Sequence, residues 1–277
     1  MDTKTHVERR QALRRAVPEG AILFLGLEEA PRNYPANPYP FRQDSHFLYY
    51  VGTNLPGMAA LITPDGGEIL FGAPEDPDDL VWHGPHPGLA DHAERAGIAG
   101  SASTADLPRA LDDLRKQGVK IHYLPPYRAE RCIHLGGLLD VHPAEVAAGA
   151  SQELARAVVE QLSIKTAAEV LEIEEALQVS SEMYQAAFRV TEAGRRESEV
   201  AGAMQGVALM YDRAQSFPPI VSVRGEVLHN TSYRNILEDG QLLLIDSGTE
   251  SPGFYASDIT RTIPVSGHYS DEQRLIY

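Results

Sequence analysis

The hydrophobic pattern changes its period along this chain, and that change constrains the fold more than any other feature. Before residue 150, short apolar runs are separated by Pro, Gly and Asn, a pattern typical of strands. From Ser151 the apolar residues recur at helical spacing, and two-residue alternation then returns. The predicted strands are 21–27, 47–52, 59–63, 68–71 and 120–124, and later 218–223, 241–245 and 258–265. We therefore expect a mixed α/β protein.

Helix-start patterns define the predicted domains. A capping box, in which a Ser or Thr is followed three residues later by Glu or Gln, occurs at Thr5, Thr166 and Ser270. The predicted helices are 5–17, 104–117, 151–162, 166–194 and one opened by Ser198. We expect an N-terminal α/β domain over 1–160 and a second mixed domain over 161–277. Because so little chain follows Ser270, we also expect the sequence to be part of a longer protein.

Composition excludes several classes of partner. The 277 residues include 24 Lys and Arg against 39 Asp and Glu, a net charge of −15. This charge opposes binding to nucleic acid or to an anionic membrane surface. A single cysteine, Cys132, favours a reducing cytoplasm, and the apolar run 21–27 is too short to span a bilayer.

Two carboxylates follow or begin predicted strands near the end of the chain. Asp246 ends the apolar run Leu242 to Ile245, and Asp258 begins the next strand twelve residues later. Oxygen ligands of this kind suit a divalent metal, and we expect the carboxylates to converge on one cavity with one pKa raised by mutual repulsion. The residues alone leave an alternative, in which Asp-Ser-Gly is turn chemistry and Asp258 pairs with Arg261.

A third candidate is His229, although a histidine of this kind, taken alone, is more often a loop histidine with satisfied hydrogen bonds than a catalytic one. His229 belongs to a set of segments that are more specific together than apart: 221–225, His229-Asn230, 240–248 and 255–262, with 40–52 and Trp82-His83-Gly84-Pro85 in the first half. Together these segments resemble the aminopeptidase P and prolidase branch of the pita-bread metallopeptidases. The resemblance covers nearly the whole chain.

The resemblance implies two divalent metal ions, commonly manganese, with zinc or cobalt as alternatives. It implies that Asp246 is held mainly by one metal, that Asp258 bridges the pair, and that His229 faces the substrate near the scissile bond. The family's metal-binding His and two Glu would lie beyond Tyr277. We therefore expect these 277 residues alone to be inactive.

Other histidines and the tryptophan have separate interpretations. His83 and His86 lie in a Pro- and Gly-rich loop, where solvent or a subunit contact is favoured over metal ligation. The resemblance makes Trp82 a candidate substrate contact at a neighbouring subunit's site in a homo-oligomer, dimer or tetramer. Packing within its own domain is the alternative.

The function implied by the resemblance is hydrolysis of the bond between an N-terminal residue and a following proline. The close alternative is prolidase, which cleaves Xaa-Pro dipeptides only. A different class is a non-catalytic pita-bread protein that binds peptides, histones or RNA. The presence of Asp246, Asp258 and His229 disfavours that class, and also the metal-free relative creatinase, which lacks the Asp pair.

Overall fold

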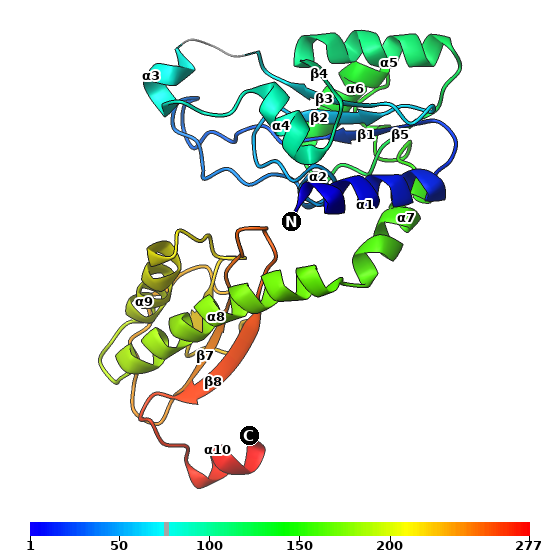
Figure 1. Cartoon of the computed structure of the whole chain (residues 1–277). Helices are drawn as coiled ribbons and strands as arrows, with labels where there is room; N and C mark the ends of the chain where they lie inside the picture. The colour runs from blue at the N-terminus through cyan, green and yellow to red at the C-terminus, as the bar shows by residue number, and fades with distance from the viewer. Residues whose placement is uncertain (75–77) are drawn as a thin grey trace. The chain divides into compact units, whose positions relative to one another are not determined.

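The structure is a computed structural model that describes residues 1–74 and 78–277. The chain consists of two compact units, residues 1–164 and 165–277. Both units mix helices with a sheet, so the expected α/β class is confirmed (Figure 1). Within the described residues, no helix combines the length and apolarity needed to cross a membrane.

The first unit is built on a five-stranded sheet with the order β4-β3-β2-β1-β5. Its strands are β1 (Ala21–Leu25), β2 (Ala59–Ile62), β3 (Glu68–Gly72), β4 (Gly100–Ser103) and β5 (Ile121–His122). The β1–β2 and β2–β3 pairs are antiparallel, whereas β1–β5 and β3–β4 are parallel. The sequence analysis did not predict β4, whose small residues Gly, Ser and Ala lack the apolar signal of a strand.

Helices cover both faces of this sheet. The helices of this unit are α1 (Thr3–Ala16), α2 (Ser45–Val51), α3 (Asp79–His83), α4 (Leu89–Ala96), α5 (Leu107–Lys116), α6 (Ala129–Leu139) and α7 (Gln152–Ser163), with a short 3₁₀ turn η1 (Thr104–Asp106) before α5. Ile22 and Phe24 pack into a core with residues of α1, α2, α4 and α7, while Leu23 belongs to a core with α5 and α6. Because each face has a core, all five residues of β1 are buried.

Two local predictions in this unit are wrong. The segment 47–52 is helical rather than extended, because the Asp44 side chain accepts hydrogen bonds from the backbone N–H groups of His46 and Phe47 and so caps α2. Gly52, at φ 76°, ends that helix in the left-handed conformation. In α1 the cap is Asp2, whose side chain accepts from the Thr5 N–H, so Thr5 is inside the helix.

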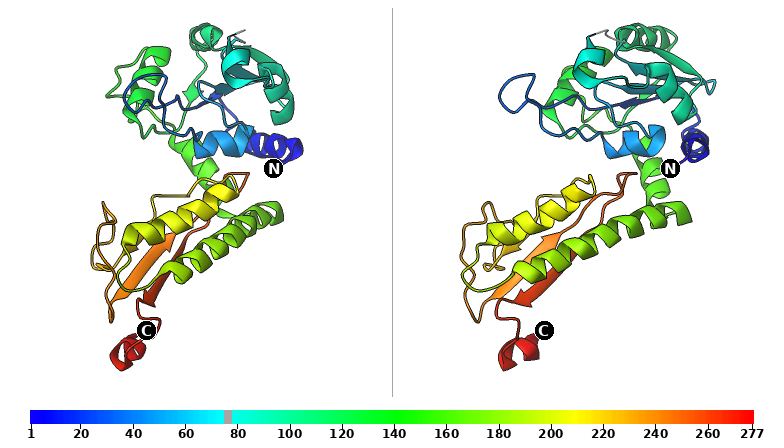
Figure 2. Two further views of the ribbon diagram at one scale, coloured as in Figure 1. Left: turned by 90° about the vertical axis from the view of Figure 1, so that its left-hand side faces the viewer. Right: turned by 60° about the vertical axis from the view of Figure 1, so that its left-hand side comes forward.

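The second unit packs helices on one face of a three-stranded antiparallel sheet (Figure 2). Its elements are α8 (Ala167–Val190), α9 (Glu197–Met210), β6 (Ile220–Ser222), β7 (Leu242–Ser247), β8 (Ile259–Pro264) and α10 (Asp271–Ile276). The predicted capping boxes at Thr166 and Ser270 are confirmed at the starts of α8 and α10.

Successive residues of β7 point alternately to the helix-covered face of this sheet and to its opposite face, which we call the open face. Leu243 and Ile245 are fully buried in the core formed with α8 and α9. Leu242, Leu244 and Asp246 therefore project from the opposite face. Asp246 pairs with Thr260 of β8, so the open face also carries the even-numbered residues of β8.

Candidate metal centre

Asp246 and Asp258 line one cavity on the open face of the second unit's sheet. Asp246 lies near the end of β7, and Asp258 directly precedes β8. Since β7 and β8 are antiparallel, the end of one strand lies beside the start of the other. The cavity has a volume of about 450 Å³ and is lined by Phe217, Pro218, Ile220, His229, Asn230, Asp246 and Asp258. The expected convergence of the two carboxylates is confirmed.

The side chains of Asp246 and Asp258 are close enough for their negative charges to repel each other. Partial burial, followed by the negative charge of Asp246 and a hydrogen-bonding contact with its side chain, raises the pKa of Asp258. Oδ1 of Asp246 is buried and has no hydrogen-bond partner within the part of the chain that the structure describes. A buried carboxylate oxygen without a donor is costly, so this atom would gain from a cation.

His229 reaches the same cavity from the loop between β6 and β7. This loop is largely exposed, and His229 itself is exposed. The other lining residues divide into two kinds: Phe217, Pro218 and Ile220 are apolar, whereas His229 and Asn230 are polar. The cavity can therefore hold a molecule with an apolar group beside polar groups.

The sequence analysis did not identify the other cavity residues. Asn230 could have been found from its position next to His229, and Ile220 from its register, because it pairs with Asp246 and shares its face. Phe217 precedes β6, and no sequence signal places it at the cavity.

The pair does not form a complete ligand cluster. Among residues 1–74 and 78–277, no group of three or more His, Cys, Asp or Glu side chains is arranged to hold a metal ion. His86 lies in the first unit and lines a different cavity of about 510 Å³ together with His92. Trp82 also lies in the first unit, in α3, and is 78% exposed.

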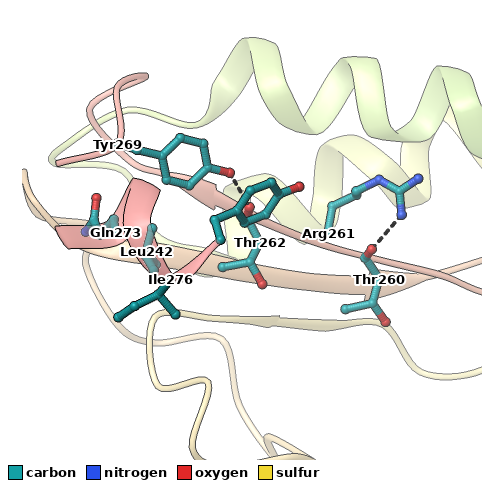
Figure 3. A pocket seen from close by; sticks show the side chains of 8 residues that line it. Leu242, Thr260, Arg261, Thr262, Tyr269, Gln273 and Ile276 are labelled. Carbon is teal, nitrogen blue, oxygen red and sulfur yellow. Dashed lines mark hydrogen bonds between the residues drawn. The ribbon is translucent and has the colours of Figure 1, made fainter. Parts of the chain in front are cut away.

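A second hollow lies elsewhere on the sheet, between β8 and α10 (Figure 3). It measures about 500 Å³, and Tyr269 closes one side by donating a hydrogen bond to the Thr262 carbonyl at 2.7 Å. Its lining includes Arg261, Gln273 and Tyr277 but neither Asp246 nor Asp258. The carboxylate pair therefore distinguishes the first cavity as the candidate site.

The fold and the carboxylate pair define a class: an α/β domain followed by part of a pita-bread metallopeptidase domain. Comparison with known families agrees. Residues 6–122 match the aminopeptidase P N-terminal domain, and residues 172–277 match metallopeptidase family M24. Over both matched regions the chain is thus similar to the aminopeptidase P members of this family.

Individual relatives extend over nearly the whole chain. An Xaa-Pro aminopeptidase of Haemophilus influenzae is 30% identical over 94% of this chain and 60% of its own length. The Xaa-Pro aminopeptidase of Escherichia coli K12 is 28% identical over 97% of this chain and 64% of its own length. The chain thus spans about three fifths of the curated relatives it matches.

Solved structures show the same correspondence in three dimensions. A variant of Escherichia coli aminopeptidase P in complex with substrate superposes with a TM-score of 0.86 at 25% identity, over 100% of this chain and 66% of its own. Aminopeptidase PepP of Pseudomonas aeruginosa gives a TM-score of 0.86 at 25% identity, over 100% of this chain and 65% of its own.

Proposed function

We propose that this protein is a metallo-aminopeptidase that hydrolyses the bond between an N-terminal residue and a following proline. The observation that carries the proposal is the convergence of Asp246 and Asp258 on one cavity that His229 also lines. The names of the bacterial relatives supply the substrate class. Residues 161–277 would carry the metal centre, and residues 1–160 would form a domain that limits substrate length.

The residues present fit divalent metal ions. Two carboxylates offer hard oxygen donors, and one oxygen of Asp246 is buried without a hydrogen-bond partner among the described residues. The raised pKa of Asp258, to which the negative charge of Asp246 contributes, agrees with this fit, because a bound cation would offset the repulsion between the two carboxylates. We propose Mn²⁺ as the native metal, bound as a pair, with Zn²⁺ or Co²⁺ as alternatives.

The roles of the chain's own residues follow from the cavity. Asp246 and Asp258 would hold the metal ions, which supply polarisation of the scissile carbonyl and a water nucleophile at neutral pH. His229 would donate a hydrogen bond to the peptide near the scissile bond and so orient it. Phe217 and Ile220 would exclude water from the apolar part of the substrate.

Two carboxylates alone offset only half of the positive charge of two divalent ions. The resemblance implies five protein ligands, of which these residues supply two. We therefore expect residues 1–277 on their own to bind Mn²⁺ weakly and to show no hydrolysis. We further propose a cytoplasmic homo-oligomer, although one relative is named as a mitochondrial peptidase of Arabidopsis thaliana.

The test is hydrolysis of an Ala-Pro-Ala tripeptide with and without Mn²⁺. The assay uses residues 1–277 and the longest form of the protein that its gene encodes, each with Asp258→Asn as a paired variant. We expect Mn²⁺-dependent release of alanine by the longest form and its loss in the variant, because one of the two carboxylates that would hold the metal ions is removed.

Other outcomes would replace the proposal. Cleavage of the dipeptide Ala-Pro without cleavage of the tripeptide would make the protein a prolidase. Binding of the tripeptide without hydrolysis by any form would make it a non-catalytic binding protein. Full activity in Asp258→Asn would remove the carboxylate pair from the metal centre.

A further inference from the structure

The loop that carries His229 needs an external support. It runs from residue 224 to residue 234, and most of its side chains, including those of Glu226 and Leu228, are exposed. A segment with so little buried apolar surface is held mainly by contacts at its ends. Those ends are Val223, which directly follows β6, and Asn235.

One buried carboxylate contacts both ends of this loop. Glu197, the first residue of α9, is 0% exposed. Its Oε1 accepts from the Val223 backbone N–H and from Nδ2 of Asn235, both at 2.9 Å, and its Oε2 accepts from the Asn235 backbone N–H at 3.3 Å. The carboxylate therefore bridges two points that are separated by the whole loop.

Backbone hydrogen bonds anchor Glu197 against the far end of the loop. The Glu197 N–H donates to the Asn235 carbonyl at 3.1 Å, and the Ser198 N–H donates to the Tyr233 carbonyl at 3.1 Å. The start of α9 is thus fixed beside residues 233–235. The side chain of Glu197 extends that fixed point to Val223 at the near end.

A carboxylate is the group that this position requires. Three N–H donors converge on it, and an ionised carboxylate accepts only, so none of the three meets a competing donor. Charge-assisted bonds of this kind are stronger than neutral ones, and the N-terminus of α9 favours a negative charge. An amide would present N–H groups to at least one of the same donors.

We propose that Glu197 is a positioning residue for His229. It fixes both ends of the 224–234 loop, and thereby the place of His229 at the cavity lined by Asp246 and Asp258. The role assigned to His229 rests on the function proposed above. We call the fixing of both loop ends by Glu197 the loop clamp. The loop clamp rests only on the contacts of Glu197 and is independent of the proposed function.

The variants are Glu197→Ala, Glu197→Gln and Asn235→Ala, with Glu199→Gln as the matched control. Glu199 lies in the same first turn of α9, but its side chain is 43% exposed and contacts Arg195 and the Arg196 backbone instead of the loop. Each Glu→Gln change removes one negative charge from the helix N-terminus. Thermal unfolding is measured first, and only variants that remain folded are used in the two measurements that follow.

The first measurement is backbone amide hydrogen exchange by NMR, without metal. In Glu197→Ala we expect the Val223 and Asn235 amides to exchange at least about tenfold faster, with a smaller effect in Glu197→Gln and none in Glu199→Gln. Asn235→Ala removes one of the three bonds, so a smaller increase at Val223 is expected. In the double variant Glu197→Ala/Asn235→Ala, the Val223 amide should exchange no faster than in Glu197→Ala alone.

The second measurement reports the position of His229. Substoichiometric Mn²⁺ should broaden the ring resonances of His229 and the amide of Ser247 in the unsubstituted protein. In Glu197→Ala we expect the broadening of His229 to fall severalfold while that of Ser247 persists. A purely structural role would leave the ratio of the two unchanged.

Each outcome decides a separate question. Unchanged exchange at Val223 and Asn235 in folded Glu197→Ala would overturn the clamp, and unchanged His229 broadening would overturn the positioning role. Absence of any Mn²⁺ broadening near Asp246 would instead count against the proposed metal centre. The exchange data would then decide the clamp by themselves.

Discussion

At the scale of single residues, His6 is a buried base that the proposed chemistry does not use. It is 6% exposed, and its Nδ1 lies 3.0 Å from the Tyr49 carbonyl oxygen. Burial lowers the pKa of His6 to about 4, against an ordinary value of 6.5. His6 is therefore neutral at pH 7, with the proton on Nδ1 donated to Tyr49.

This pKa predicts loss of stability in mild acid. Between pH 6.5 and pH 4 the unfolded chain takes up a proton at His6 that the folded chain refuses. The contribution is fully present above pH 6.5 and is lost as the pH falls through 4, by on the order of 3 kcal/mol at most. Urea unfolding at several pH values should show a shallower acid dependence in His6→Gln than in the exposed-site control His134→Gln. Identical slopes would contradict the prediction.

The carboxylate pair predicts effects of opposite sign with and without metal. In the metal-free protein at pH 7, Asp246→Asn and Asp258→Asn should each raise the unfolding temperature, because one of two repelling charges is removed. With Mn²⁺ each should weaken binding at least about tenfold by calorimetry, because a ligand is lost. Asp239→Asn, which changes an exposed acid of the same unit, is the control. Raised stability with unchanged Mn²⁺ binding would leave the pair without a metal role.

At the scale of elements, Tyr184 connects α8 to both β7 and β8. Its hydroxyl lies 3.1 Å from the Ile245 carbonyl oxygen and also donates to the Ile259 carbonyl. Ile245 directly precedes Asp246, and Ile259 directly follows Asp258. One buried hydroxyl thus contacts the backbone beside each carboxylate.

Removing that hydroxyl should loosen the carboxylate pair. Tyr184→Phe leaves two buried carbonyls without this donor, so we expect a loss of about 1 to 2 kcal/mol in the free energy of unfolding and several-fold weaker Mn²⁺ binding. Tyr211→Phe is the control, since Tyr211 donates to Oε1 of Glu182 on the surface of the same helix. Equal effects of the two substitutions on metal affinity would exclude a specific role for Tyr184.

How far the sequence predicts these elements depends on whether the signal is local. The apolar run of β7 and the short distance to Asp258 predicted two carboxylates at the ends of neighbouring strands, and the resemblance to the pita-bread metallopeptidases favoured their convergence over the turn alternative. The prediction of a strand at 47–52 was wrong because its apolar residues fit either a strand or one face of a helix. The Asp44 cap stabilises the helix. Tyr184 and Glu197 have no sequence signal for their roles, since each acts on residues distant in the chain.

At the scale of the whole molecule, the first unit carries an exposed apolar segment that supports the proposed homo-oligomer. Leu80, Val81 and Trp82 of α3 are 59%, 81% and 78% exposed. Adjacent large apolar side chains in water are unfavourable, and aromatic residues are enriched at protein interfaces. The segment is therefore the place where we expect a second copy of the chain to bind.

Trp82 also makes this expectation measurable, because it is the single tryptophan of the sequence. If Trp82 enters a subunit interface, its fluorescence should shift to shorter wavelength as the protein concentration rises, in step with the mass from sedimentation velocity. Trp82→Ser should weaken self-association at least about tenfold, because a buried aromatic anchor is lost. Tyr127→Ser, at a site 65% exposed in the same unit, should have no such effect. Association that persists in Trp82→Ser, or a tryptophan spectrum independent of concentration in an oligomer, would place the interface elsewhere and leave Trp82 without contact to a neighbouring subunit's site.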